Sequence, residues 1–312
     1  MDMTGLIGFT RLVILAMVPY TLAAQGTMLA GRTGVFIVAQ EGIMLVGASV
    51  GFLGAYLSGN LALGLLLAMM VGGLFGLALS VFTTNLKLDQ FVIGLALFFI
   101  GLALSTLLYK LFVGVTLAPP IIPTLDRVSI PWLGSLPILG PLLFQHNLMV
   151  YFAVVISAVL YYFLHHTGAG LELRAVGENP KAADSLGVNV AQRRHLASIA
   201  GGMLMGLAGA YLPMVYTGTF TAGIARGRGW IAIALAFFGG WSPHWILLGS
   251  LFFAAVEVLA LRVQIGAFGI PHQVLRTLPY LATMVVMAFA FRGARQPAFL
   301  GMNYDRESRT GV

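Results

Sequence analysis

The chain has 312 residues, of which 59% are hydrophobic and only 9% are charged, and its mean hydropathy is +0.94. This composition excludes an ordinary soluble domain and is typical of integral membrane proteins. The sequence has no cysteine, which excludes disulfides and thiolate metal sites. Its net charge of +7 fits basic residues at a membrane edge better than a nucleic-acid partner.

Apolar segments follow one another along the chain, and most approach the roughly 20 residues that a helix needs to cross about 30 Å of hydrocarbon. The predicted segments are 12–30, 35–58, 61–82, 91–109, 148–164, 196–216, 230–241, 245–261 and 277–291. The first resembles a signal peptide, with Arg11 ahead of an apolar run, but the many segments downstream favour a transmembrane helix. We predict one all-α polytopic membrane domain, residues 1–312, with about nine membrane segments.

Small residues recur four positions apart in three of these segments. The three stripes are Gly47, Gly51 and Ala55; Gly72, Gly76 and Ser80; and Gly202, Gly206 and Ala210. Such stripes let helix backbones approach closely inside a membrane, where lipid gives no hydrophobic drive to pack. In a glycine-rich chain, one such stripe could arise by chance, but three are less easily explained in this way.

The second segment contains Glu41, between Gln40 and Gly42. A carboxylate inside a membrane helix is costly unless it faces the bundle interior or a water-filled path. Two interpretations remain open: Glu41 lines a translocation path or makes a buried polar contact, or it lies near the cytoplasmic end and extends to water. Gln40, Glu41, Gly42 and Gln90, which directly precedes the fourth segment, are candidate path residues.

A proline-rich loop, 113–147, separates the fourth and fifth segments. Its six prolines are Pro119, Pro120, Pro123, Pro131, Pro137 and Pro141. The prolines rigidify the loop, which suits the docking of an external partner. A re-entrant lid packed on the bundle explains the composition equally well.

A charged stretch, Glu172 to Arg194, interrupts the apolar pattern and must face water. Its seven charged residues are Glu172, Arg174, Glu178, Lys181, Asp184, Arg193 and Arg194. Asn179 suits a helix N-cap, Pro180 the first helical position, and Gly187 a left-handed C-terminal residue. The pattern predicts a helix of one to two turns.

Residues 227–243 contain a second irregularity. The apolar core from Trp230 to Phe238 would rise only about 14 Å as a helix, and Gly239, Gly240 and Pro243 then interrupt it. Short, interrupted hydrophobic segments often mark half-helices that line a substrate path. We favour this interpretation over an ordinary short helix, and Trp230, Gly239 and Gly240 join the candidate path residues.

The distribution of Lys and Arg sets the expected orientation. Ten of the 17 would lie on the same side of the membrane as the charged stretch, and seven on the opposite side. Because cytoplasmic loops carry an excess of Lys and Arg, this distribution favours a cytoplasmic charged stretch. We therefore expect an outside N-terminus, a periplasmic loop at 113–147, a cytoplasmic loop at 172–195 and a cytoplasmic tail at 292–312.

Several catalytic motifs are absent from the sequence. It has no G-x-x-x-x-G-K-[ST] loop, no H-E-x-x-H, no G-x-S-x-G and no histidine cluster with metal-ligand spacing. Few ionisable residues lie within the predicted segments, which disfavours proton coupling. The chain is therefore expected to be a passive or externally powered permease, not an enzyme.

Residues 174–190, RAVGENPKAADSLGVNV, closely resemble the cytoplasmic coupling segment of permease subunits in bacterial ABC importers for ribose-like sugars, nucleosides and branched-chain amino acids. Residues 31–48, 136–147, 227–243 and 270–280 are similar to the nucleoside-type permeases that work with basic-membrane-protein lipoproteins. The resemblance runs from Arg11 to Phe291. It departs at residues 31–40, and this departure leaves the substrate open between a standard nucleoside and another solute.

The resemblance implies a place in the inner membrane and several partners. Cytosolic ABC ATPase subunits would bind ATP and magnesium, so this chain needs no cofactor of its own. A periplasmic or lipid-anchored binding protein would deliver substrate, and a second permease, identical or longer, would complete the path within membrane lipid. The residues implied in ATPase coupling are Glu178, Asn179, Pro180, Lys181, Ala182, Ala183, Asp184 and Ser185.

In this scheme a short helix at Pro180 sits in a groove of the ATPase, where Ala182 and Ala183 allow close approach. The stretch from Asn189 into the sixth segment acts as a lever. Branched-chain amino acids or another small polar solute are alternative substrates. An ATP-independent facilitator is the alternative from another functional class, and an intramembrane hydrolase lacks any candidate nucleophile and base.

Overall fold

The computed structural model describes residues 3–115, 118–129, 140–265, 277, 281–282, 284–285, 288 and 296–306. Seven of its helices contain a stretch long and apolar enough to cross a membrane. They are α1 (Met3–Gly31), α2 (Gln40–Ser58), α3 (Leu61–Ser80), α4 (Gln90–Val113), α5 (Leu148–His166), α8 (Val190–Tyr211) and α10 (Pro243–Ile265). Three shorter helices are α6 (Gly168–Glu178), α7 (Pro180–Ser185) and α9 (Arg228–Phe238).

Irregular elements complete the described chain. Three π-helical turns are η1 (Val81–Asn85), η2 (Gly140–Phe144) and η3 (Leu212–Thr217), of which η1 extends α3 and η3 extends α8. Two antiparallel strands, β1 (Arg127–Ser129) and β2 (Gln145–Asn147), pair with Arg127 opposite Asn147. The helical, polytopic architecture expected from the sequence is confirmed.

The predicted segments agree with these helices except in their number. Seven of them become the long helices, and 230–241 becomes the short α9. The ninth, 277–291, lies outside the described residues apart from a few isolated positions. The expected count of nine is therefore unconfirmed, and seven long apolar helices are described.

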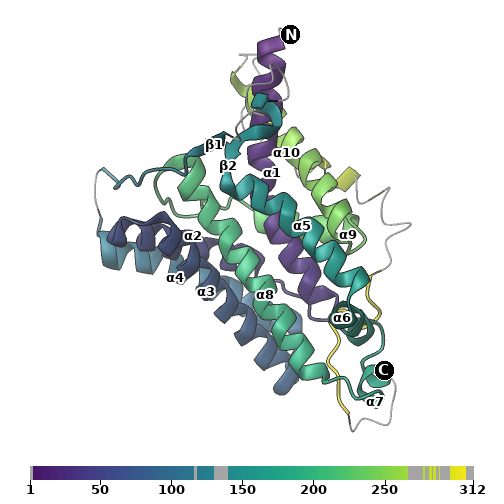
Figure 1. Ribbon diagram of the computed structural model, residues 1–312. Helices are drawn as coiled ribbons and strands as arrows, with labels where there is room; N and C mark the ends of the chain where they lie inside the picture. The colour runs from purple at the N-terminus through teal and green to yellow at the C-terminus, as the bar shows by residue number, and fades with distance from the viewer. Residues whose placement is uncertain are drawn as a thin grey trace.

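Helix α8 is the centre of the bundle and packs against α1, α2 and α3. Figure 1 shows α2, α3 and α4 on one side of α8, with α1, α5, α9 and α10 on the other. The glycine stripes form these contacts, as predicted. A Cβ on Gly72 would overlap the carbonyl oxygen of Gly202, and a Cβ on Gly47 would lie 2.7 Å from the Cα of Gly206.

The two ends of the bundle carry different features. The start of α1 and the β1–β2 pair lie at one end, while α6 and α7 lie at the other (Figure 1). Residues 296–306 contact α6 and α7 at this second end. Asparagine or threonine side chains cap three consecutive helices at the α7 end: Thr167 caps α6, Asn179 caps α7 and Asn189 caps α8.

The proline-rich loop is described only in part, because residues 116–117 and 130–139 lie outside the described residues. Its described part is tied to the bundle. The amide of Ile122 donates to the carbonyl of Gly218 (2.8 Å), and that of Leu125 donates to Met214 (2.9 Å). These contacts favour the packed alternative for this part, and the docking of an external partner stays a prediction.

Candidate functional site

A short helix, α9, forms where the sequence predicted an interrupted membrane segment. Its 11 residues rise about 16 Å, roughly half of the hydrocarbon core. Gly240 and Trp241 have positive φ and turn the chain before α10 begins at Pro243. The carbonyl of Trp241 accepts a hydrogen bond (2.8 Å) from Arg32 Nε, just beyond α1. A short apolar helix therefore lies where the sequence predicted one, and its role as a half-helix that lines a path stays a prediction.

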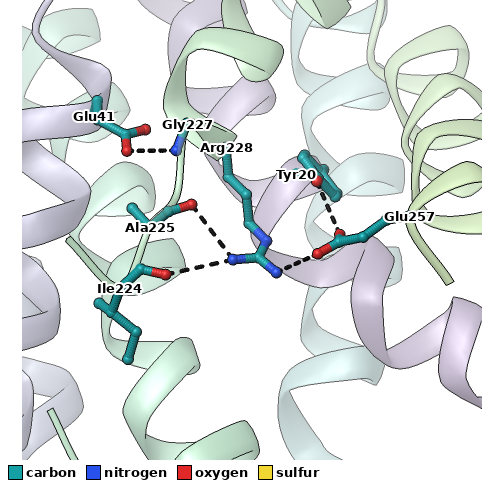
Figure 2. A network of polar contacts seen from close by, with 7 residues as sticks. All are labelled: Tyr20, Glu41, Ile224, Ala225, Gly227, Arg228 and Glu257. Carbon is teal, nitrogen blue, oxygen red and sulfur yellow. Dashed lines mark hydrogen bonds and ion pairs between the residues drawn. The ribbon is translucent and has the colours of Figure 1, made fainter. Parts of the chain in front are cut away.

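The carboxylate of Glu41 caps the N-terminus of α9. Its Oε1 accepts from the amide of Gly227 at 2.7 Å (Figure 2). Its Oε2 accepts from the amide of Gly229, also at 2.7 Å. The first amides of a helix lack intrahelical partners and carry partial positive charge, so an anion stabilises them. Glu41 is buried, which makes the interpretation that it extends to water wrong and supports the buried polar contact.

A second polar contact lies beside the first. Arg228, the first residue of α9, forms an ion pair with Glu257 of α10 and donates to the carbonyls of Ile224 and Ala225, both at 3.4 Å. The hydroxyl of Tyr20 in α1 donates to the other oxygen of Glu257 at 2.9 Å (Figure 2). The arginine and glutamate side chains are only 14% and 19% exposed, so each charge depends on its partner.

This pair was not predicted from the sequence. Arg228 is one of the seven basic residues that the Lys and Arg count assigned to the outer side, whereas the structure buries it inside the bundle. Glu257 was not singled out, although a lone carboxylate inside the apolar run 245–261 is the signal that would have found it. Through Glu41 of α2, Glu257 of α10 and Tyr20 of α1, the N-terminus of α9 is a meeting point of three long helices.

The other candidate path residues near α2 are held by packing or hydrogen bonds. Gln40 is fully buried and donates to the hydroxyl of Thr27 at 3.1 Å. A Cβ on Gly42 would lie 2.7 Å from the Cα of Phe98, so this glycine lets α2 and α4 touch. Trp230 is 40% exposed and packs edge-on against Phe98, with ring centroids 5.5 Å apart. Trp230 is thus the candidate that is open to an external group.

The remaining candidates lie at the ends of their helices. A Cβ on Gly239 would lie 2.6 Å from Cγ1 of Ile246, so this glycine allows α9 to pack on α10. Gln90 is buried, accepts from the amide of Phe36 (2.7 Å) and donates to the carbonyl of Met302 (3.2 Å). The structure makes Gln90 a link between the α1–α2 connection and the C-terminal part of the chain. The role of these residues in a path stays a prediction.

The charged stretch folds as its residues predicted. Asn179 caps α7 by accepting from the amide of Ala182 at 3.0 Å, Pro180 is the first residue of the helix, and Gly187 has φ +85°. The chain enters α8 at Val190, so α7 is joined to the central helix of the bundle by only a few residues. The predicted one-to-two-turn helix is confirmed.

The residues expected to contact the ATPase are only partly exposed. Glu178, Asn179, Lys181, Ala182 and Ser185 are exposed. Pro180 and Ala183 are buried, and Ala183 packs with Val176 and Val190, so it cannot offer a surface for close approach. Asp184 is half-buried, with its carboxylate held by Tyr304 and Arg306.

A close joint connects the charged stretch to the α1–α2 connection. A Cβ on Gly177 of α6 would overlap the carbonyl oxygen of Arg32, and Gly34 has φ +86° where it passes Arg194. The side chain of Arg194 is fully buried and its Nε donates to the carbonyl of Thr33 at 3.1 Å. Arg194 was expected to face water with the rest of the charged stretch, but the structure makes it a buried link between α8 and the connection that leads to Glu41.

Arg32 and Tyr304, which lie at the α7 end and outside the membrane-spanning segments, have shifted pKa values. Burial, and then the nearby charge of Arg174, lowers the pKa of Arg32, while Glu178 opposes this shift. Burial, and then the hydrogen bond to Asp184, raises the pKa of Tyr304. The Tyr304 hydroxyl therefore keeps its proton at neutral pH and acts as a donor.

Comparison with known proteins agrees with this architecture. Residues 9–289 match the family described as branched-chain amino acid transport system / permease component. The chain is 32% identical to a putative glucose ABC transporter permease protein, TsgC13, of Haloferax volcanii, with 92% of this chain and 94% of the relative covered. It is 34% identical to the nucleoside ABC transporter permease protein NupC of Lactococcus lactis, with 92% and 93% covered.

A third relative is the guanosine ABC transporter permease protein NupQ of Bacillus subtilis, 30% identical with 93% of this chain and 94% of the relative covered. Haloferax volcanii and Bacillus subtilis each have a second, more distant relative, of which the alignment covers only 78% and 80%. No solved structure matches the chain. The family match and these identities over nearly the full length show that the chain belongs to the family of branched-chain amino acid transport system permease components.

Proposed function

We propose that this chain is the membrane-spanning permease subunit of an ATP-driven ABC importer for a nucleoside or a simple sugar. The family describes a transport permease, and the relatives are named for nucleoside, guanosine and glucose transport. The observation that carries the proposal is a continuous series of contacts. It runs from the exposed α7, through Gly177 and Arg32, to Glu41 at the N-terminus of α9.

The contacts suggest how ATP-driven movement reaches the path. The exposed face of α7 (Lys181, Ala182 and Ser185), together with Glu178 at the end of α6, sits in a groove of a cytosolic ATPase subunit, which binds the ATP and magnesium. When the ATPase subunits close, α6 moves with α7, and the close contact of Gly177 with Arg32 moves the α1–α2 connection. This connection leads into the first turn of α2, which carries Glu41, so the N-terminus of α9 shifts and alternates the side to which the path opens.

The orientation of the chain in the membrane sets where the remaining partners bind. The α7 end faces the cytoplasm and the N-terminus lies outside, across the inner membrane. A periplasmic or lipid-anchored binding protein docks at the end that carries β1 and β2. A second permease completes the path, and the longer relatives in two of the same organisms favour a longer partner over an identical one.

Reconstitution tests the proposal. The chain is placed in proteoliposomes alone, or with its ATPase subunits, second permease and binding protein, and entry of labelled guanosine or glucose is measured with and without ATP. Uptake should require every partner and ATP. Sustained flux through this chain alone, without ATP, would instead identify an ATP-independent facilitator.

A further inference from the structure

The C-terminal part of the chain packs against the α7 end of the bundle. Residues 296–306, here the C-terminal strap, were expected only as part of a tail. The amide of Phe299 donates to the carbonyl of Gly177 in α6 (2.9 Å), and that of Gly301 donates to Gly34 in the α1–α2 connection (3.0 Å). The strap thus contacts both sides of the joint that leads from α7 to Glu41.

Two buried side chains depend on the strap. The carbonyl of Met302 accepts from Arg194 Nη2 of α8 (3.1 Å) and from Gln90 Nε2 of α4 (3.2 Å). Both side chains are almost fully buried, and a buried donor that loses its partner is costly. The strap therefore supplies hydrogen bonds that the interior of the bundle needs.

The end of the strap bridges two separate elements. Asn303 donates to the carbonyls of Lys87 (2.7 Å) and Leu88 (3.0 Å), and Asp305 pairs with Lys87 (2.9 Å), in the connection between α3 and α4. On the other side, the Tyr304 hydroxyl donates to Asp184 of α7 at 3.1 Å, and Arg306 Nε pairs with the same carboxylate oxygen at 3.0 Å.

We propose that the strap is a second transmission element, and that Asp184 is a positioning residue that acts through Tyr304. The inference rests on the proposed function of α7. A six-residue helix is too short to hold its position by itself. The contact of Asp184 with the strap fixes α7 to the α3–α4 connection and to the α1–α2 connection. Movement imposed on α7 therefore reaches both sides of the bundle.

The strengths of the two contacts to Asp184 differ. Arg306 is 80% exposed, so water screens its ion pair, and a surface ion pair adds little. Tyr304 is half-buried and packs with Val176, Ala183 and Val190 under α7. Its hydrogen bond is consequently the contact that a variant should remove, and Tyr304→Phe removes one hydroxyl while keeping the ring.

The experiment measures substrate imported per ATP hydrolysed by the full transporter in proteoliposomes. The variants are Asp184→Ala, Tyr304→Phe, their combination and Lys181→Glu, with Tyr162→Phe, an exposed tyrosine of α5, as the matched control. The ratio should fall roughly threefold to tenfold in Tyr304→Phe and in Asp184→Ala, as expected for loss of one hydrogen bond. The combination should be no worse than Asp184→Ala, because both variants remove the same hydrogen bond. Tyr162→Phe should keep the wild-type ratio.

Each other outcome overturns the inference in a different way. A normal ratio in Tyr304→Phe with a reduced ratio in Lys181→Glu would reject the strap and keep α7 as the coupling helix. Normal ratios in all variants would reject the proposed function as well. Loss of ATPase co-purification in Asp184→Ala, with Tyr304→Phe normal, would make Asp184 an ATPase contact. Thermal unfolding of each purified variant shows whether it is folded, and Tyr304→Phe still decides the question if Asp184→Ala is unfolded.

Discussion

Glu41 and Gly229 meet at the start of α9, where the carboxylate of Glu41 accepts a hydrogen bond from the backbone amide of Gly229 at 2.7 Å. The two residues lie 188 positions apart in the chain. Because α9 crosses only about half of the hydrocarbon core, its first turn needs a partner inside the bundle. The first turn of α2 provides that partner, so the positions of the two helices are linked.

Removal of the Glu41 carboxylate should weaken both the fold and transport. Glu41→Ala leaves the amides of Gly227 and Gly229 without this acceptor, at about 1–3 kcal/mol for each buried donor. We expect a lower unfolding temperature of the purified protein and reduced uptake by the assembled transporter. Glu41→Gln keeps an acceptor oxygen and should retain more of both. Wild-type uptake by Glu41→Ala would show that the cap has no part in transport.

Gly229 should tolerate no side chain. A Cβ at this position would lie 2.6 Å from the Cα of Glu41 and 2.9 Å from its Oε2. Gly229→Ala should therefore destabilise the protein by about 1–3 kcal/mol. Gly168→Ala is the matched control, since among the described residues no atom lies within 4 Å of its Cβ position. Equal unfolding temperatures of the two variants in detergent would contradict the close approach of α2 and α9.

The ion pair between Arg228 and Glu257 should show strong coupling. Glu257→Leu leaves a buried guanidinium without its carboxylate and should cost about 3–5 kcal/mol. Arg228→Met should be similarly harmful, because it leaves the carboxylate unpaired. The double variant should be more stable than either single variant. Unfolding temperatures in detergent test this, and additive losses would show that the two charges are independent.

The exposed face of α7 should couple ATP hydrolysis to transport. Lys181→Glu reverses a charge on this face without touching the buried side of the helix. It should leave the permease folded and the ATPase active but reduce the substrate imported per ATP by at least about tenfold. Lys181→Arg keeps the charge and should couple normally. Glu178→Lys should behave as Lys181→Glu does, and normal uptake by both reversals would remove α7 from the coupling path.

Local features of this chain could be predicted from sequence, because they depend on neighbouring residues. The caps of α7 at Asn179 and Gly187 and the interruption after Phe238 all follow from nearby residue types. The glycine stripe that includes Gly206 also predicted where helices touch, since close packing requires small side chains.

The candidate site was only partly predictable, because its contacts join distant segments. Glu41 was identified as an unusual carboxylate and α9 as an unusual helix, but nothing in the sequence showed that one caps the other. The burial of Arg194 and the inward side of Ala183 depend on tertiary packing. The role of residues 296–306 was missed because some of their hydrogen bonds use backbone groups, which leave no mark in the sequence, and the others join side chains to segments far away in the chain.

The most direct test is the accessibility of α9 in the assembled transporter. The sequence has no cysteine, so Trp230→Cys places the only thiol of this chain on the exposed side of α9. Leu107→Cys, on the outer face of α4, is the control. The labelling rate of Trp230→Cys by a membrane-impermeant maleimide should change when ATP is added. It should stop responding to ATP when Lys181→Glu is also present, and Leu107→Cys should not respond. Equal rates for Trp230→Cys with and without ATP would contradict ATP-driven movement of α9.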